Sequence, residues 1–311
     1  MYRYVLRRLV QSIFLLLGIS AMVFFVMRIA PGGPTAFTGD PRLGKVYLEQ
    51  QRQEFGLDQP LPVQYGKWLW QAVQGNFGRS YTDKRPVMTV IAERTPRTLL
   101  LSGLSLLFGL FGIVFGVFAA LRRGGLYDNG LRVLTVVGNA VPHWWLGLII
   151  LLISARTIKI FPLAPPTDGA LLPWIHFLIL PVLLGALGGW LGFSRFMRSE
   201  MLEVISQDYV RTARAKGLSE STVTFRHALR NALIPIVTIL GGSLAGLFSG
   251  SVLFENVFSY PGLGKLAVEA AFQRDLPVTM ALVLISAALV IVGQLIADIA
   301  YGFVDPRVKL D

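Results

Sequence analysis

Long apolar stretches alternate with short polar segments along most of this chain. Six stretches are long enough to cross a hydrocarbon core of about 30 Å, which takes roughly 20 residues of α-helix. They lie at Leu9–Ile29, Thr98–Leu121, Leu131–Ala155, Pro173–Phe193, Leu233–Leu253 and Pro277–Phe303. Of the 311 residues, 53% are hydrophobic and only 15% are charged, which argues against a soluble domain. The pattern predicts an all-α polytopic membrane protein with six transmembrane helices.

Lysine and arginine residues are divided unevenly between the two sides that six spans would create. The short segments of one side, which include both termini, hold fifteen of them, and those of the other side hold four. The long segment after the first span is left out of this count, because loops over about 60 residues are translocated largely regardless of charge. Basic short segments stay in the cytoplasm, so we expect an N-in/C-in topology. This distribution accounts for the formal net charge of +11 without a nucleic-acid partner.

The segment between the first two spans is too rich in apolar residues to be a bare linker. Three short helices are predicted in it, near Tyr47–Phe55, over Tyr65–Val73, and from Val87 to an end at Pro96. Gly75 follows the second of them as a stop signal. We expect a small folded extracytoplasmic subdomain over residues 31–95, with the alternative that Trp68 and Trp70 lie at the headgroup level of the membrane surface.

A strongly charged segment, Asp208–Pro235, separates the fourth and fifth spans and cannot lie in lipid. The residues around Ala213 favour a helix that Gly217 can end, because glycine adopts the left-handed cap conformation without steric cost. Ser219 can then accept a hydrogen bond from a free amide at the start of a second helix. The segment therefore predicts a compact helix–turn–helix, an element suited to docking another protein.

This segment also carries a family resemblance. RTARAKG (211–217) and FRHALRNALIP (225–235) resemble the signature loop of bacterial ABC-importer permeases of the dipeptide/oligopeptide/nickel branch. The strings MYRYVLRRL, GLDQPLPVQYGKWL, GNFGRS, FSYPGLGKL and VDPRVK fit the same branch. In the generic family pattern, Glu, Ala and Pro stand where this chain has Arg211, Thr212 and Arg230, whereas Ala213 and Gly217 match. These departures are similar to the peptide-branch variant of the loop.

The resemblance implies a fold and an assembly. It implies a type I importer permease core of five spans over residues 96–303, preceded by an extra N-terminal helix (1–30) and followed by a cytoplasmic tail (304–311). It further implies a bacterial inner-membrane location, a heterodimer with a second permease, two ABC ATPase subunits and an extracytoplasmic solute-binding protein. Di- or oligopeptides are the expected solutes, with nickel or another small solute as the alternative.

In that family the signature loop, here residues 195–232, forms the coupling element that docks on the ATPase. The resemblance therefore assigns ATPase coupling to Arg211, Thr212, Ala213, Arg214, Lys216, Gly217, Leu218 and Ser219. We expect Ala213, Gly217 and Leu218 at its centre and the basic residues at its rim.

Catalytic patterns are missing from the sequence. GLGKL at Gly262–Leu266 lacks the spacing of a phosphate-binding loop, and neither G-x-S-x-G nor H-E-x-x-H occurs. There is no cysteine, and the three histidines lie far apart. We therefore expect no catalytic residue, no metal site and no cofactor. An ion-coupled secondary transporter would need intramembrane charges, for which only His143 and Asp298 are available, and a structural role is the simpler interpretation of both.

Glycines recur every four residues in several spans. In the fifth span they are Gly242, Gly246 and Gly250. Such spacing lets helix backbones approach closely in lipid. Two interpretations stay open for these three glycines, helix packing within the chain and a face beside a second permease at the translocation pathway.

Overall fold

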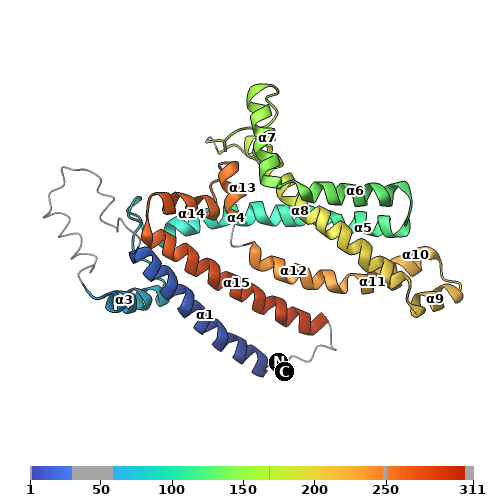
Figure 1. Cartoon of the computed structure of the whole chain (residues 1–311), viewed down its shortest axis with the longest axis horizontal. Helices are drawn as coiled ribbons and strands as arrows, with labels where there is room; N and C mark the ends of the chain where they lie inside the picture. The colour runs from blue at the N-terminus through green and yellow to red at the C-terminus, as the bar shows by residue number, and fades with distance from the viewer. Residues whose placement is uncertain (1, 30–58, 168, 248–250, 305–311) are drawn as a thin grey trace.

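The computed structural model describes residues 2–29, 59–167, 169–247 and 251–304, and helices dominate this part of the chain (Figure 1). Its extended pairing is limited to an isolated antiparallel bridge between Arg79 and Pro86 in the described residues. The helices are α1 (Tyr2–Ile29), α3 (Leu61–Val73), α4 (Val87–Gly109), α5 (Phe111–Leu121), α6 (Leu126–Ala140), α7 (His143–Arg156), α8 (Leu171–Ile205), α9 (Asp208–Ala215), α10 (Glu220–Thr222), the π-helical segment η2 (Val223–Ala228), α11 (Leu229–Ala232), α12 (Ile234–Gly246), α13 (Val252–Val257), α14 (Leu263–Phe272) and α15 (Leu276–Val304). The predicted all-α class is confirmed.

In the part of the chain that the structure describes, four apolar helical segments are long enough to cross a membrane. They are Leu6–Ile29, Val87–Leu121, Leu171–Ile205 and Leu276–Ile296. The helices α6 and α7 form a fifth candidate that is bent by 82° at the break between them. Pro142 lies at this break and offers no backbone donor, so the predicted third span is a broken helix. The predicted fifth span corresponds to α12, a shorter helix that ends at Gly246.

The helix α4 corrects one prediction, because Pro96 lies inside it and does not end a shorter helix. An internal proline removes the hydrogen bond to the residue four positions earlier. The turns before Pro96 are held by tertiary packing instead, since Val87, Val90 and Ile91 are buried in a cluster with residues of α14 and α15. The helix that contains the second predicted span therefore begins at Val87 and not at Thr98.

Glycines bring α5 and α8 into backbone contact. A Cβ atom at Gly112 would overlap the backbone of Trp190, and one at Gly116 would overlap the carbonyl oxygen of Ser194. Both glycines are buried, and α8 packs along α4 and α5 over much of its length (Figure 1). In lipid such close packing replaces the hydrophobic effect as the force between helices. The glycine spacing in the second predicted span thus serves packing within this chain.

The helix α3 packs on α1 and α15. The hydroxyls of Tyr65 and Ser20 are hydrogen-bonded at 2.8 Å, and the rings of Tyr65 and Trp68 both contact Phe24, which is completely buried. Trp68 therefore packs against α1 and α15. Trp70, in contrast, is 68% exposed. The predicted helix over residues 65–73 is confirmed, while the one near residues 47–55 lies outside the described residues.

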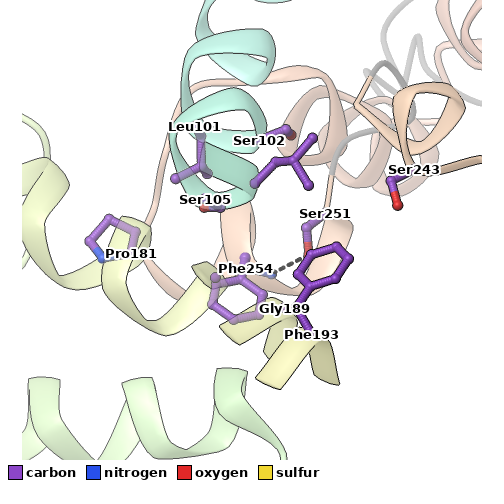
Figure 2. Close-up of a pocket in the computed structure, with 11 residues that line it drawn as sticks. Leu101, Ser102, Ser105, Pro181, Gly189, Phe193, Ser243, Ser251 and Phe254 are labelled. Carbon is purple, nitrogen blue, oxygen red and sulfur yellow. Dashed lines mark hydrogen bonds between the residues drawn. The ribbon is translucent and has the colours of Figure 1, made fainter. Parts of the chain in front are cut away.

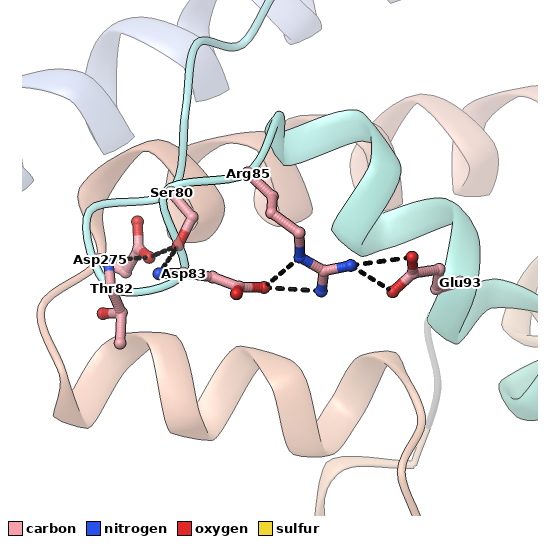
Figure 3. A network of polar contacts seen from close by, with 6 residues as sticks. All are labelled: Ser80, Thr82, Asp83, Arg85, Glu93 and Asp275. Atoms are coloured by element: carbon pink, nitrogen blue, oxygen red, sulfur yellow. Dashed lines mark hydrogen bonds and ion pairs between the residues drawn. The ribbon is translucent and has the colours of Figure 1, made fainter.

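A buried carboxylate attaches the loop before α4 to the start of α15 (Figure 3). Asp275 is 2% exposed, and it accepts hydrogen bonds from the hydroxyl of Ser80 and, at 3.1 Å, from the backbone amide of Tyr81. An exposed ion pair between Arg85 and Asp83 lies on the surface of the same loop, at 2.6 Å. The loop is therefore a fixed part of the helical core.

Candidate coupling surface and cavity

The charged segment after α8 folds into two short helices joined by a sharp turn. The first helix, α9, ends at Ala215, and Gly217 follows with a φ of +78°. This left-handed conformation costs other residues about 1–2 kcal/mol, and glycine adopts it without that cost. Ser219 caps α10, since its Oγ accepts a hydrogen bond from the amide of Thr222 at 3.3 Å. The predicted helix–turn–helix is confirmed in both its glycine stop and its serine cap.

Seven of the eight residues assigned to coupling are exposed on this element, which we call the α9–α10 turn (residues 211–219). They are Arg211, Thr212, Arg214, Lys216, Gly217, Leu218 and Ser219. Arg214 pairs with Glu220 across the turn at 2.8 Å, and Arg211 lies 3.4 Å from Asp208. Exposed ion pairs of this kind contribute little stability, about 0–1 kcal/mol each. The surface thus combines exposed basic side chains with Leu218, an exposed apolar residue.

Ala213 occupies a different place from the other seven residues. It is 5% exposed and packs beneath the turn in a cluster with Val210 and Val223, both buried, and with Val204 at the end of α8. Ala213 was expected at the centre of the exposed face, and the structure places it beneath that face instead. Its small side chain lets α9 lie close to η2, so that it supports the turn from inside.

The turn is firmly attached to the membrane-crossing helices. Asn231 on α11 donates a hydrogen bond to the hydroxyl of Tyr209 on α9 at 2.8 Å. Beneath them, Met197 and Met201 of α8 are completely buried in a cluster with Ala228, which also includes residues of α5 and α12. Packed side chains therefore connect η2 and α11, the elements that follow the turn, with α8, α5 and α12.

A cavity of about 330 Å³ opens between α4, α8, α12 and α13 (Figure 2). It is lined by Leu101, Ser102, Ser105, Leu106, Pro181, Gly185, Gly189, Phe193, Ser243, Ser251 and Phe254. None of the described residues in this lining is charged. Ser251 accepts a hydrogen bond from the amide of Phe254, whereas the hydroxyls of Ser102 and Ser105 have no hydrogen-bond partner among the described residues. The cavity therefore combines an apolar wall with free neutral hydroxyl groups.

The fifth-span glycines lie close to this cavity in sequence. Ser243 lines it, and Gly242 and Gly246 are on the same helix, α12. A Cβ atom at either glycine would have no described atom within 4 Å, and both glycines are exposed. In the described part of the chain they therefore mediate no close helix contact, unlike Gly112 and Gly116. Gly250 lies outside the described residues.

A buried glutamate between α4 and α14 was missed by the sequence analysis. Glu255 is completely buried and accepts hydrogen bonds from the Thr98 hydroxyl at 2.8 Å and from the Lys265 amide at 3.0 Å. A Cβ atom at Gly262 would lie 2.5 Å from both the carboxylate of Glu255 and the hydroxyl of Thr98. This close approach leaves no room for a side chain at residue 262, which explains the first glycine of the FSYPGLGKL string. Burial, partly offset by these hydrogen bonds, raises the pKa of Glu255 above its ordinary value.

The structure describes the side chain of His143, one of the two intramembrane candidates for ion coupling. His143 begins α7, and its ring lies against Gly188, where a Cβ atom would be 3.1 Å from the imidazole. The side chain of Asp298 is outside the described part of α15. In the residues that the structure describes, no three His, Asp or Glu side chains gather into a group able to hold a metal ion.

Comparison with known proteins assigns the family. The family model of the binding-protein-dependent transport system inner membrane component matches residues 112–310, and the model of the N-terminal part of such membrane components matches residues 1–102. This chain belongs to the family of binding-protein-dependent transport system inner membrane components. Together with its apolar helices, this makes it a multi-pass protein of the inner membrane.

Individual relatives are similar over the whole chain. The oligopeptide transport system permease protein AppB of Bacillus subtilis is 44% identical over 99% of this chain and 100% of that protein. A putative peptide transport system permease protein of Brucella abortus is 39% identical over 99% of each chain. Among solved structures, a chain of the MetNI methionine ABC transporter in inward-facing conformations covers 70% of this chain and 97% of its own length, with 18% identity and a TM-score of 0.52. That likeness supports the fold alone.

Proposed function

We propose that this protein is one of two related permease subunits of an ATP-driven importer for di- or oligopeptides. The observation that carries the proposal is the α9–α10 turn, an exposed helix–turn–helix fixed to α8 and α12 by packed side chains. The permease itself would hold no catalytic residue, and separate ATPase subunits would bind and hydrolyse ATP. A solute-binding protein would deliver the peptide on the opposite side of the membrane.

The topology follows from the same proposal. Both termini and the coupling loop (195–232) lie in the cytoplasm, while residues 31–95 form the extracytoplasmic subdomain. For a total of six spans, the fifth crossing has to be made by α12 together with the residues that follow it. The five spans of residues 96–303 make the permease core, and residues 1–30 add the extra helix that packs on α15.

Coupling between ATP and solute would be mechanical. ATP-driven closure of the ATPase dimer draws the α9–α10 turns of the two permeases together. Because Ala213 packs the turn against Val204 of α8, and Met201 of α8 packs on Ala228 of η2, this motion rotates α8 and α12 as nearly rigid bodies. The gap between the permeases then opens outward, and hydrolysis with product release resets it.

The cavity supports a solute with neutral polar groups. Free hydroxyls on Ser102 and Ser105 can donate to or accept from peptide main-chain groups without selecting a particular side chain. The described lining contains no carboxylate or imidazole, the groups that would favour a metal ion over a peptide. We place the translocation pathway along this cavity, with the glycines of the predicted fifth span (Gly242, Gly246 and Gly250) beside the second permease.

The decisive experiment measures whether ATPase subunits co-purify with the tagged chain and whether they need the α9–α10 turn. Leu218→Asp places a charge on the exposed apolar residue of the turn, and Leu126→Asp is the matched control, because Leu126 is 94% exposed at the start of α6. We expect ATPase subunits with the wild type and the control but not with Leu218→Asp. Equal recovery with all three chains would refute docking through this turn, and absence of ATPase from every folded sample would refute the importer assignment.

A further inference from the structure

A second cavity, polar in character, lies next to the α9–α10 turn. It has a volume of about 530 Å³ and is lined by Tyr209, Arg226, His227, Arg230, Asn231 and Ile234. Its walls come from α9, η2, α11 and the first residue of α12. Asn231 holds two of these walls together, since its side-chain amide donates to the Tyr209 hydroxyl at 2.8 Å and to the His227 carbonyl at 3.1 Å.

The two guanidinium groups in this cavity carry uncompensated charge. Arg226 and Arg230 form no ion pair with any described carboxylate, whereas Arg214 and Arg211 of the neighbouring turn are both paired. The Tyr209 hydroxyl accepts from Asn231 and keeps its own proton for another acceptor. The cavity thus presents two cations and a hydroxyl donor and no anion of its own, which suits a phosphate group.

The backbone at the cavity has an unusual conformation. Residues Val223–Ala228, which include Arg226 and His227, form a π-helical segment in the middle of an otherwise α-helical run. π-Helical turns are rare and occur frequently at functional sites. This observation is independent of the charges, and it indicates that the side chains of η2 are held at positions that a regular α-helix would not give them.

The position of the cavity indicates where its ligand comes from. Ile234 forms part of the lining and also begins the apolar helix α12. Tyr209, which also lines the cavity, is 42% exposed. Tyrosine is enriched in the headgroup region of membranes. The end of an apolar helix and an exposed tyrosine thus meet in this lining, a combination that favours a lipid headgroup as the ligand, and Leu218 of the turn is not part of the lining.

We propose that this cavity binds the phosphate of an anionic phospholipid headgroup, with Arg226 and Arg230 as the charged ligands and Tyr209 as an added donor. Bound lipid would fix η2 and α11, the elements that join the α9–α10 turn to α12. Lipid occupancy would then determine how rigidly the turn is connected to the membrane helices. The binding claim itself does not depend on the proposed transport function.

The test is a titration of the full-length chain, purified in mild detergent with its partner subunits, with dioctanoyl-phosphatidylglycerol. The Arg226→Gln/Arg230→Gln double variant removes both cations, and Arg122→Gln/Arg123→Gln is the matched control, because these two exposed arginines lie at the α5–α6 turn, away from the cavity. Each basic residue near an anionic lipid contributes about 1 kcal/mol, so we expect the affinity of the double variant to fall about 30-fold. The control should bind like the wild type, and dioctanoyl-phosphatidylcholine should bind all three proteins weakly.

Several outcomes would overturn the proposal. Equal lipid affinity of the double variant and the wild type would show that Arg226 and Arg230 do not form a lipid site. An equal loss of affinity in the control would show that the lipid responds only to general surface charge. Competition by inorganic phosphate at concentrations similar to those of the lipid would make the site one for free phosphate. If the double variant kept its lipid affinity but lost ATPase co-purification, the cavity would be part of the protein docking surface instead.

Discussion

Asp128 at the start of α6 is 1% exposed and forms a two-point ion pair with Arg198 of α8, whose Nη2 lies 2.8 Å from Oδ2 of Asp128. The amide of Gly124 donates to the same carboxylate at 2.9 Å. These contacts fix the α5–α6 turn to the helix that leads into the α9–α10 turn. The pair is thus a structural joint between the core and the candidate coupling surface.

The first prediction concerns this joint. Asp128→Asn leaves Arg198 without its partner in a largely buried place, and breaking one half of such a pair costs about 3–5 kcal/mol. We expect a clearly lower thermal unfolding midpoint in detergent. Asp83→Asn is the control, because its pair with Arg85 is about half exposed and such pairs contribute at most about 1 kcal/mol. Equal midpoints for the two variants would contradict the role of Asp128.

The second prediction concerns Gly217. Its φ of +78° disfavours residues with a Cβ atom, and tryptophan adds bulk at the exposed turn. We expect Gly217→Trp to insert in the membrane normally and to abolish uptake of a labelled peptide. Gly217→Asn should retain most of the uptake, because asparagine tolerates the left-handed region. Gly75→Trp is the control, because Gly75 is another exposed glycine with a φ of +78°, and it should transport normally. Uptake by Gly217→Trp at wild-type levels would rule out coupling through this turn.

The third prediction separates two kinds of glycine. Gly112→Leu forces a side chain into the backbone of Trp190, so we expect a loss of folded protein measured by size-exclusion chromatography. Gly242→Leu meets open space among the described residues and should leave the chain folded. If the α12 face lies beside the second permease, the Gly242 variant should show reduced uptake or reduced pairing. A folded Gly112→Leu protein, or a fully active Gly242→Leu transporter, would contradict the respective assignment.

The fourth prediction is a pH dependence that arises from Glu255. Burial raises the pKa of this carboxyl above its ordinary value of 4.5. Its contribution to stability is therefore fully present below about pH 4.5 and is lost as the pH rises through the higher pKa of the folded state. We expect the thermal unfolding midpoint of the wild type to fall more steeply above pH 4.5 than that of Glu255→Gln. Glu93→Gln, an exposed change on α4, should retain the wild-type slope. Parallel curves for the wild type and Glu255→Gln would exclude this source of pH dependence.

Local patterns in the sequence were sufficient for the elements with local causes. The length of each apolar stretch sets whether a helix can cross the membrane, and the Gly217 stop and Ser219 cap act over at most a few residues. These features depend on backbone conformation and on hydrogen bonds within a turn, so the helix–turn–helix was predicted correctly. The family resemblance added the role of that element, which chain geometry alone does not supply.

The tertiary structure decided every feature that depends on partners distant in sequence. The carboxylate of Glu255 is bound by Thr98, 157 residues earlier, and Asp128 is bound by Arg198, 70 residues later. Pro96 illustrates the same limit, because burial of the turns before it keeps α4 continuous where local propensity predicts an end. Local propensity and span length are encoded in neighbouring residues, whereas long-range pairs and cavities exist only once packed helices bring distant side chains together and exclude water from between them.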